Sequence, residues 1–371
     1  MTSEPEVYFD SASSTRLHPA ARDTLLAALD RGYGDPRRLH GAGRDARLLL
    51  ENARAVVAEC LDVYPDEVSF TASGTEAVHR GLLGLAEASG RRGVVHGAVE
   101  HSSVLHAAAW RPHPSTSSIP VDRHGLVDLE ALARAAMAPE VGVIALQAAN
   151  QEVGTRQPVD AVDRPAGVPL LMDAAAAVGH GPLPRHWDVL TASAHKWGGP
   201  AGVGVLAVRR GTRWSTPFPG EDTPESPGFP DVPAALAAAA ALQAVLAEAE
   251  ELGRRQFAWI DEIRATAGAL PDVEVVGHPT DRLPHLATFS ALYVGGDEVV
   301  AELARRGFAV ASGSACTASS LEPSHVLAAM GALTHGNVRI SLSRDTTDDH
   351  VRALCAALGD VVLGIRRRAG L

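Results

Sequence analysis

The feature that most limits the fold is an alternation of helix-like and strand-like stretches between about residues 20 and 210. Helices are predicted at 19–29 and 48–61, followed by a strand at 67–71 and a helix at 76–87. Further short apolar strands are predicted at 93–96, 141–147, 170–173, 189–193 and 204–209. Strands that alternate with helices pair in parallel, so we predict a mostly parallel, doubly wound α/β sheet.

Residues 211–231 interrupt this alternation. The segment is dense in Pro and Gly and has no periodicity, so we predict a long surface loop. A long helix rich in Ala, Leu and Glu is predicted next, at about 234–270, with a break expected, if anywhere, near Leu252 and Gly253. This helix leads from the large α/β part into the rest of the chain.

Beyond the helix, the pattern predicts a smaller α+β region. Strands are expected at 273–276 and 287–291, and a helix at 297–306. A chain of 371 residues is long enough for two domains. We predict a large domain over 16–255 and a small domain over 256–371, with residues 1–15 packed against the small one.

The charge balance disfavours nucleic acid as a partner. The chain has 33 basic and 44 acidic residues, a net charge of −11, and its longest basic run is residues 366–368. Affinity for a duplex comes mostly from cations that neutralise phosphates, so this balance has the wrong sign. With 46% hydrophobic and 21% charged residues, the composition is that of a globular protein and excludes disorder of the whole chain.

The cysteines indicate a reducing compartment. There are three, Cys60, Cys316 and Cys355, too few and too widely spaced for a disulfide framework, and no CxxC or Cys/His cluster suggests a metal. The N-terminus lacks the basic and apolar regions of a signal peptide. No apolar run approaches the roughly 18 residues that span a bilayer, the nearest being 234–247. We expect a cytoplasmic protein with no membrane contact.

Lys196 is the only lysine among the 33 basic residues. Arg can replace Lys as an exposed cation, but its guanidinium stays charged and cannot form an imine. The lone lysine follows a predicted strand, in Ser193-Ala-His195-Lys196, and precedes a glycine-rich turn. It is therefore a candidate for covalent chemistry, although a codon bias that removed the other lysines is the simpler explanation until its neighbours are considered.

Two other polar groups are expected near the same edge of the sheet, where ligands of such folds bind. Asp173 ends an apolar strand and is either a helix cap or a carboxylate with a cationic partner, such as a pyridinium nitrogen. Ser73-Gly74-Thr75 opens a helix, so it is either a plain cap or an anion site. Together with Lys196, these groups indicate a phosphorylated cofactor.

The sequence resembles the cysteine desulfurases of the NifS/IscS type, which are class V aminotransferase-like enzymes with the fold-type I architecture of pyridoxal phosphate enzymes. The resemblance runs from Tyr8-Phe-Asp-Ser-Ala-Ser-Ser14 to Asn337-Val-Arg-Ile-Ser-Leu342. Its most specific stretch is Ser312-Gly-Ser-Ala-Cys-Thr-Ala-Ser-Ser, which is similar to the active-site cysteine loop of that family.

The resemblance implies a set of residues that bind pyridoxal 5'-phosphate. Lys196 would be the Schiff-base lysine, Asp173 the partner of the pyridinium nitrogen, and His101 the histidine that stacks on the cofactor ring and moves protons. The implied phosphate site consists of Gly74, Thr75, Ser193 and His195.

The resemblance also implies residues for the substrate. Asn150 would lie near the cofactor's phenolic oxygen and the substrate, and Arg339 would bind the substrate carboxylate through its planar guanidinium. Cys316 would attack the substrate sulfur, and its polar Gly- and Ser-rich loop gives the access that a nucleophilic thiol needs. Read without the resemblance, Cys316 has the alternative of a small inert residue, against which its polar neighbours argue.

Two positions depart from the family's pattern. The family has Asp-x-x-Gln after the apolar strand, with the amide reaching the phenolic oxygen, whereas this chain has Ala176 in place of the glutamine. The family also has Arg-x-Gly-Thr crossing a dimer interface, whereas the aligned stretch here, about 225–229, has neither Arg nor Thr, and Thr223 is the nearest replacement.

We therefore predict a homodimeric, pyridoxal phosphate-dependent cysteine desulfurase. It would convert L-cysteine to L-alanine, form a persulfide on Cys316, and pass the sulfur to an acceptor protein or a small-molecule pathway. One alternative is a C–S lyase that does not use Cys316. Another is a degenerate desulfurase-like scaffold, which the changes at Ala176 and Phe229 would allow.

Overall fold

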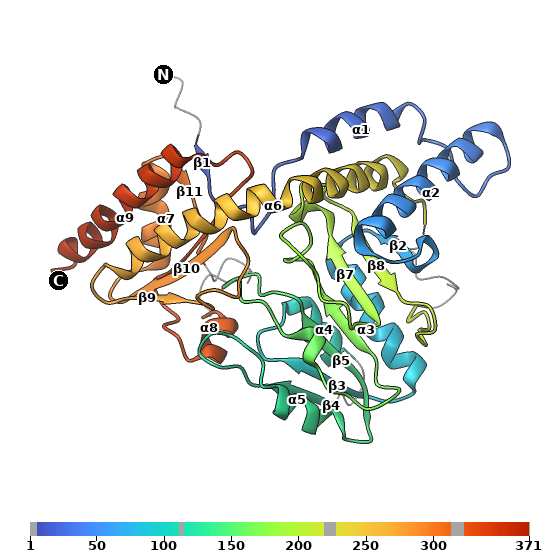
Figure 1. The fold of residues 1–371 in the computed structure, drawn as a ribbon, viewed down its shortest axis with the longest axis horizontal. Coiled ribbons are helices and arrows are strands. Elements are labelled where there is room, and N and C mark those ends of the chain that lie inside the picture. The colour runs from blue at the N-terminus through green and yellow to red at the C-terminus, as the bar shows by residue number, and fades with distance from the viewer. Residues whose placement is uncertain (1–5, 111–114, 219–227, 313–322, 371) are drawn as a thin grey trace.

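The computed structural model describes residues 6–110, 115–218, 228–312 and 323–370. Its centre is a seven-stranded sheet with the strand order β2-β8-β7-β6-β5-β3-β4 (Figure 1). The strands are β2 (Val68–Thr71), β3 (Gly93–Gly97), β4 (Ser115–Ile119), β5 (Val141–Gln147), β6 (Leu170–Asp173), β7 (Val189–Ser193) and β8 (Gly204–Val208). Strands β4, β3, β5, β6 and β7 are parallel, and β8 is antiparallel to both of its neighbours. The predicted doubly wound, mostly parallel sheet is confirmed.

Helices cover both faces of this sheet because its strands are apolar on both sides. Leu170, Met172 and Leu190 belong to a core with α2 (Gly41–Leu61), α5 (Leu129–Ala136) and the start of α6 (Val232–Gly268). Their neighbours Leu171 and Val189 belong to a second core with α3 (Gly74–Ser89) and α4 (Ser102–Ala109). Successive side chains of a strand point to opposite faces, and this alternation produces the layers. Helix α1 (Pro19–Leu29) contacts α6 at the outside of the first layer.

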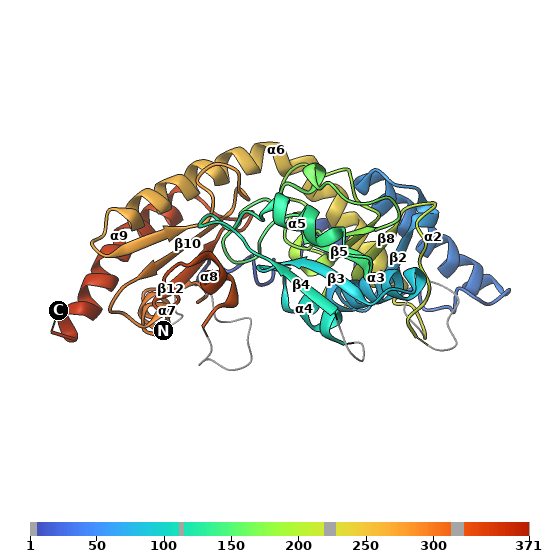
Figure 2. The same ribbon diagram turned by 90° about the horizontal axis from the view of Figure 1, so that it is seen from below.

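Helix α6 joins the two parts of the molecule (Figure 2). Its first half, including Ala237 and Leu242, packs in the core of the large sheet, and its second half, including Trp259 and Ile263, packs in the other core. The helix runs unbroken for 37 residues, without the break that the sequence allowed near Gly253. A glycine inside a helix costs only about 1 kcal/mol, and packing at both ends outweighs that cost.

By length and composition alone, α6 would also qualify as a membrane span, in contrast to the expectation from its sequence. The core helix of a soluble protein passes the same test, and residues along α6 are shared between two protein cores. The apolar character of α6 is thus explained by packing within the chain.

The second part is built on a three-stranded antiparallel sheet of order β12-β10-β9. Phe9 of the N-terminal segment belongs to its core. The elements of this part are β9 (Val273–Val276), β10 (Leu286–Ala291), α7 (Gly296–Arg305), α8 (His325–Met330), β12 (Asn337–Ser341), α9 (Asp348–Arg368) and the parallel pair β1 (Val7–Tyr8) and β11 (Phe308–Ala309). The predicted domain boundary at residue 255 falls inside α6 and stays a prediction.

Three short 3-10 turns complete the described elements: Pro65–Glu67, Val159–Ala161 and Ala194–Lys196. The last one follows β7 directly and carries the lone lysine. Ser193 and Asp173 are the final residues of the neighbouring strands β7 and β6, so both lie at the carboxyl edge of the sheet, where such folds bind ligands.

Candidate functional site

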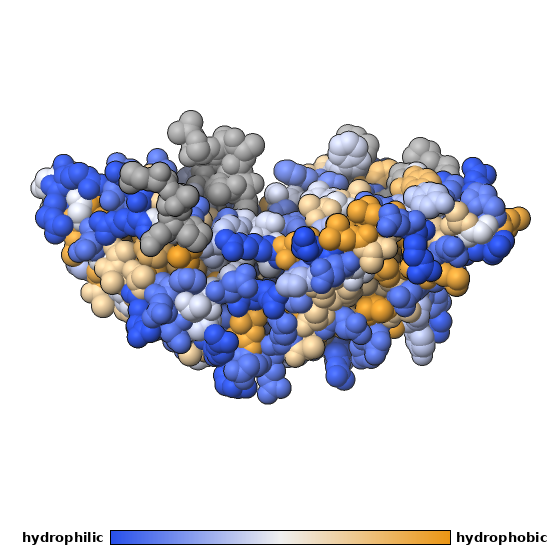
Figure 3. Space-filling model, turned by 90° about the horizontal axis from the view of Figure 1, so that it is seen from above, coloured by the Kyte–Doolittle hydropathy of each residue, from blue (hydrophilic) through white to orange (hydrophobic). Residues whose placement is uncertain are grey.

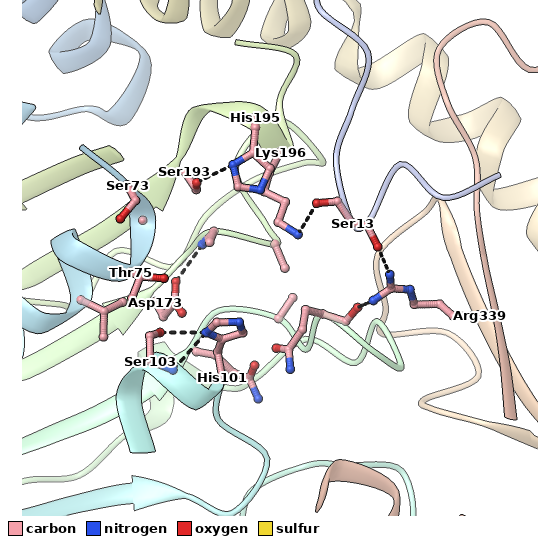
Figure 4. Close-up of a pocket in the computed structure, with 17 residues that line it drawn as sticks. Ser13, Ser73, Thr75, His101, Ser103, Asp173, Ser193, His195, Lys196 and Arg339 are labelled. Atoms are coloured by element: carbon pink, nitrogen blue, oxygen red, sulfur yellow. Dashed lines mark hydrogen bonds between the residues drawn. The ribbon is translucent and has the colours of Figure 1, made fainter. Parts of the chain in front are cut away.

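A cavity of about 330 Å³ lies at the carboxyl edge of β6 and β7 (Figure 4). Its size is at the lower end of the range for small-molecule sites. The wall combines residues of the large sheet with Ser13 of the N-terminal segment and Arg339 of β12. The cavity thus lies where the two parts of the chain meet.

The amine of Lys196 is directed to the N-terminal segment. Its Nζ donates to the carbonyl oxygens of Ala12 and Ser13, the latter at 3.0 Å. A further hydrogen bond joins the same two segments, since Thr15 Oγ1 donates to the Lys196 backbone carbonyl at 2.9 Å. The segment around residues 12–15 therefore determines where the lone lysine amine lies in the cavity (Figure 4).

Asp173 is a buried carboxylate without an ion pair among the described residues. Its Oδ1 accepts hydrogen bonds from the Ala175 backbone at 3.0 Å and from Thr191 Oγ1 at 3.4 Å. Burial raises the pKa of Asp173, while the nearby His101 acts in the opposite direction. A buried carboxylate with one face on a cavity is suited to a cationic ligand group.

His101 lies opposite Asp173 at the start of α4. Its Nδ1 accepts a hydrogen bond from the Ser103 backbone and is 2.8 Å from Ser103 Oγ, which fixes the ring orientation. Burial lowers the pKa of His101, and Asp173 partly offsets that effect. A neutral imidazole in this position has its other nitrogen available to exchange a proton with a ligand.

The start of α3 faces the end of β7 across a very short distance. A Cβ atom at Gly74 would lie 2.7 Å from the Cβ of Ser193, so only glycine permits this approach. Ser73 caps α3 by accepting a hydrogen bond from the backbone of Glu76, and Thr75 follows in the first turn. The free N–H groups of a helix start attract anions, so this corner of the cavity is suited to a phosphate.

Ser193 and His195 complete that corner. The Ser193 hydroxyl and Nδ1 of His195 are 2.9 Å apart and share a hydrogen bond. Burial lowers the pKa of His195, as does the charge of Lys196. Both side chains line the cavity together with Gly74 and Thr75, so the four residues expected at a phosphate site lie together.

Arg339 forms the opposite wall and is 2% exposed. Its Nη2 donates to Asp10 Oδ1 at 3.0 Å and to Ser13 Oγ at 2.5 Å, and its Nη1 donates to the Gln151 carbonyl at 3.1 Å. The buried Nε has no partner among the described residues. Asp10 therefore orients the guanidinium, and two of its five N–H donors, one on Nη1 and the one on Nε, are not used by these contacts.

Three residues expected at the site, Asn150, Cys316 and Thr223, are not found in the cavity wall that the structure describes. Asn150 is fully buried but does not line the cavity. Its Nδ2 donates to the Val99 carbonyl, and its Oδ1 accepts from the Glu152 and Val153 backbones. Its contact with cofactor or substrate stays a prediction. Cys316 and Thr223 lie outside the described residues, as does most of the stretch 225–229.

Several lining residues were not predicted from the sequence. Ser13 and Gln151 contact Arg339, and Ser103 orients His101. Ser13 lies within the N-terminal motif that carried the family resemblance, which was the one available signal. Gln151 contacts Arg339 through its backbone carbonyl, so its side-chain identity gave no indication of this contact.

The donors and acceptors of the cavity fit a ligand with three features. An anionic group fits the corner at Gly74 and Ser193, a cationic ring nitrogen fits Asp173, and a carbonyl that reacts with an amine fits Lys196. A phosphorylated pyridine aldehyde has all three.

The chain is similar to known proteins in both sequence and fold. The profile described as aminotransferase class-V matches residues 7–354. A cysteine desulfurase of Cereibacter sphaeroides is 34% identical, over 97% of this chain and 96% of that protein. A cysteine desulfurase IscS of Dictyoglomus turgidum is 31% identical, over 97% and 95%. The solved structure of a NifS-like protein superposes with a TM-score of 0.88, at 27% identity, over 97% of this chain and 100% of that chain.

Proposed function

The chain belongs to the class-V aminotransferase family, and from this premise we propose that it is a pyridoxal phosphate-dependent cysteine desulfurase. It would take the sulfur of L-cysteine and release L-alanine. One observation carries the proposal: Lys196, Asp173 and the corner at Gly74 and Ser193 line the same cavity. The chain is also similar to a cysteine desulfurase over nearly its whole length.

The cavity fits pyridoxal 5'-phosphate. Gly74, Thr75, Ser193 and His195 would hold the phosphate, and Asp173 would pair with the protonated ring nitrogen. When bound, the cofactor supplies an electron-withdrawing ring that stabilises negative charge on the substrate's Cα. The raised pKa of Asp173 supports this assignment, because the carboxylate is buried without the cation that would stabilise its charge.

Lys196 and His101 would move protons. Lys196 must lose a proton to become a nucleophile, and the two carbonyl oxygens that bind its Nζ keep the amine at the cavity wall until a ligand displaces it. His101 is held neutral by burial and oriented by Ser103, so it would accept or return a proton at the nitrogen that Ser103 does not occupy.

Arg339 lines the cavity and would bind the substrate carboxylate through N–H donors that its contacts with Asp10, Ser13 and Gln151 leave unused. The guanidinium is planar and fixed in place by Asp10, Ser13 and the Gln151 carbonyl, so it would hold the amino acid in one orientation.

Cys316 would receive the sulfur. Its thiolate would form an S–S bond to the substrate sulfur as the Cβ–S bond breaks, leaving a persulfide on the enzyme for transfer to an acceptor. The described residues that flank its segment support this role. Ala311 pairs with the Arg339 backbone, and Ser324 donates to Glu152, next to Gln151.

We also propose that the protein acts as a homodimer in the cytoplasm. Large apolar side chains are exposed on α1, α2 and the connection between them: Leu26, Leu29, Tyr33, Leu39 and Leu48. Figure 3 shows apolar residues on the half of the molecule that carries these helices. Exposed apolar surface of this kind marks interfaces. Cys60 and Cys355 are free thiols, consistent with a reducing compartment.

The decisive experiment measures the products formed from L-cysteine with added cofactor. We expect alanine, with sulfide or persulfide, and Cys316→Ala should abolish alanine formation without loss of the bound cofactor's visible absorption. Pyruvate in place of alanine would identify a C–S lyase. A protein that gains no visible absorption from added cofactor would be a scaffold. A labelled-sulfur transfer assay with candidate acceptors would then identify the acceptor.

A further inference from the structure

A second pocket, of about 500 Å³, lies at the opposite edge of the large sheet from the cavity. Pro169 and Asp188, which line it, come directly before β6 and β7, whereas the cavity lies at the carboxyl ends of these strands. Helix α3 connects the two places, because Gly74 at its start lines the cavity and Ser89 at its end lines the pocket. A helix of 16 residues is about 24 Å long, so a ligand in the pocket would not touch one in the cavity.

The charge of this pocket is opposite in sign to that of the whole chain. Its wall contains three arginines and one aspartate, a net charge of +2, in a chain whose net charge is −11. The arginines come from three separate turns: Arg91 follows α3, Arg164 precedes β6, and Arg213 follows β8. We call this space the arginine pocket. Cations brought together from distant parts of an acidic chain indicate an anionic ligand.

Arg164 is held in the wall with one edge of its guanidinium unused. Its Nη1 donates to the Val168 carbonyl at 2.8 Å and to the carboxylate of Asp188. The same carboxylate accepts from the Leu170 backbone at 2.7 Å, so Asp188 is itself fixed. No described residue accepts from Nε or Nη2 of Arg164, and neither nitrogen is sealed from water, in a side chain that is 24% exposed. Parallel N–H groups of this kind bind two oxygens of one phosphate or carboxylate.

Arg91 is also fixed in position. Its Nη1 donates to the Val141 carbonyl and its backbone N–H donates to Ser89 Oγ, both at 3.1 Å. Gly142 leaves room for this turn, because a Cβ there would lie 2.4 Å from Ser89 Oγ. Arg213 differs, since its side chain is exposed and makes no hydrogen bond or ion pair with the described residues. Two cations are thus placed before a ligand arrives, and the third can adjust to it.

Charge and volume together select the class of ligand. A phosphate group carries about −1.5 to −2 charges at pH 7, which matches the net charge of the wall, and its oxygens suit arginine donors. The volume lies within the range of about 300–1,000 Å³ that is typical of small-molecule sites, and it exceeds the needs of a single ion. Ala88 and Pro169 add apolar surface to the wall, and Thr212 adds a hydroxyl.

We propose that the arginine pocket binds the phosphate group of a small molecule. The free edge of Arg164 holds two phosphate oxygens, and Arg91 and Arg213 neutralise the remaining charge. The pocket is separate from the cavity, so this inference goes beyond the proposed function and does not rest on it.

The test is a calorimetric titration of the full chain with pyridoxal phosphate bound, so that the corner at Gly74 and Ser193 does not take up the probe. The probes are inorganic phosphate, adenosine 5'-monophosphate and, as the probe without phosphate, adenosine. We expect saturable binding of both phosphates with a Kd below about 1 mM, and none of adenosine. Tighter binding of the monophosphate would mean that the organic part contributes, whereas equal or weaker binding would mean that phosphate alone is recognised.

Variants then locate the binding. Arg164→Gln removes the free edge and should weaken phosphate binding about tenfold or more, because hydrogen bonds to a charged group are lost. Arg213→Gln should weaken it as well, and it breaks no contact among the described residues, so it serves if Arg164→Gln fails to fold. Arg134→Gln is the matched control, since this exposed arginine of α5 does not line the pocket. No saturable phosphate binding, or equal binding by the control and both pocket variants, would overturn the proposal.

A second measurement is independent of the cofactor. Crystals grown without phosphate or sulfate and soaked in tungstate should show this phosphate-like anion between Arg91, Arg164 and Arg213. Tungstate found only at the corner of Gly74 and Ser193 would contradict the arginine pocket. If the wild-type protein gains no visible absorption from added cofactor, the proposed function fails, and these crystals still decide whether the pocket binds an anion.

Discussion

The two walls of the cavity are built in different ways. In the wall at Gly74 and Ser193, each group lies at or just after the end of a strand of the large sheet, so the local backbone places each one and the sheet brings the two together. The wall at Arg339 joins Asp10, Ser13 and Gln151, which are 329, 326 and 188 residues away in the chain. The first wall depends on local backbone geometry, and the second depends on how the two parts of the chain meet.

Lys196 lies between the two walls, and changing it should have the largest effect. Lys196→Arg keeps the positive charge but removes an amine that can lose its proton, so alanine formation should fall at least 1,000-fold. The visible absorption of bound cofactor should change in the same variant. Turnover within about tenfold of wild type would show that Lys196 acts only as a cation.

Gly74→Ala tests the local wall. The new Cβ would lie 2.7 Å from Ser193 Cβ, and overpacking of this kind costs about 1–3 kcal/mol. We expect cofactor affinity to fall by about tenfold or more, with a smaller loss of thermal stability, measured by cofactor titration and calorimetry. Gly41→Ala is the matched control, because a Cβ there meets nothing within 4 Å at the start of another helix. Equal behaviour of the two variants would contradict a special role for this approach.

Asp10→Asn tests the long-range wall. The change leaves the buried guanidinium of Arg339 without its countercharge, so the KM for cysteine should rise several-fold and thermal stability should fall. Cofactor affinity should stay near wild type, because Asp10 does not line the cavity. Steady-state kinetics and cofactor titration separate these effects, and a loss confined to cofactor affinity would mean that the two walls are not independent.

The smallest expected effect concerns pH. The pKa of His180 is about 4 in the folded protein, compared with about 6.5 when unfolded, so the unfolded chain binds the proton first as pH falls. Stability of the apoprotein is therefore fully present above pH 6.5 and decreases toward pH 4. His180→Phe should lose fewer degrees of melting temperature across this interval than wild type. An identical pH dependence for both would show that His180 titrates normally.

The same contrast explains what could be predicted from the sequence. Strands β5, β6 and β7 match their predicted residues 141–147, 170–173 and 189–193, because continuous apolar runs bounded by turns indicate buried strands. The placement of Lys196 after β7 followed from the same local pattern.

Features set by distant contacts could not be predicted. Strand β4 is polar and mostly exposed at the sheet edge, so its sequence resembles a loop. Helix α2 begins at Gly41, seven residues before the predicted start, because His40 caps it by accepting from the Gly43 backbone. The Asp10–Arg339 pair and the hydrogen bond of Asn150 to Val99 join residues that are far apart in the chain. Such contacts form only in the assembled fold, so the spacing of residues in the sequence could not predict them.

The contact between the first residues and β12 has a consequence for synthesis. Phe9 and Asp10 leave the ribosome early, but the strand that carries Arg339 follows about 330 residues later. At 5–20 residues per second, the N-terminal segment waits roughly 20–60 s for this partner. During that time the carbonyls of Ala12 and Ser13 can already bind Lys196, but Asp10 cannot orient the arginine. The large sheet can thus form on the ribosome before its cavity is complete, and the substrate wall is the last part of the site to assemble.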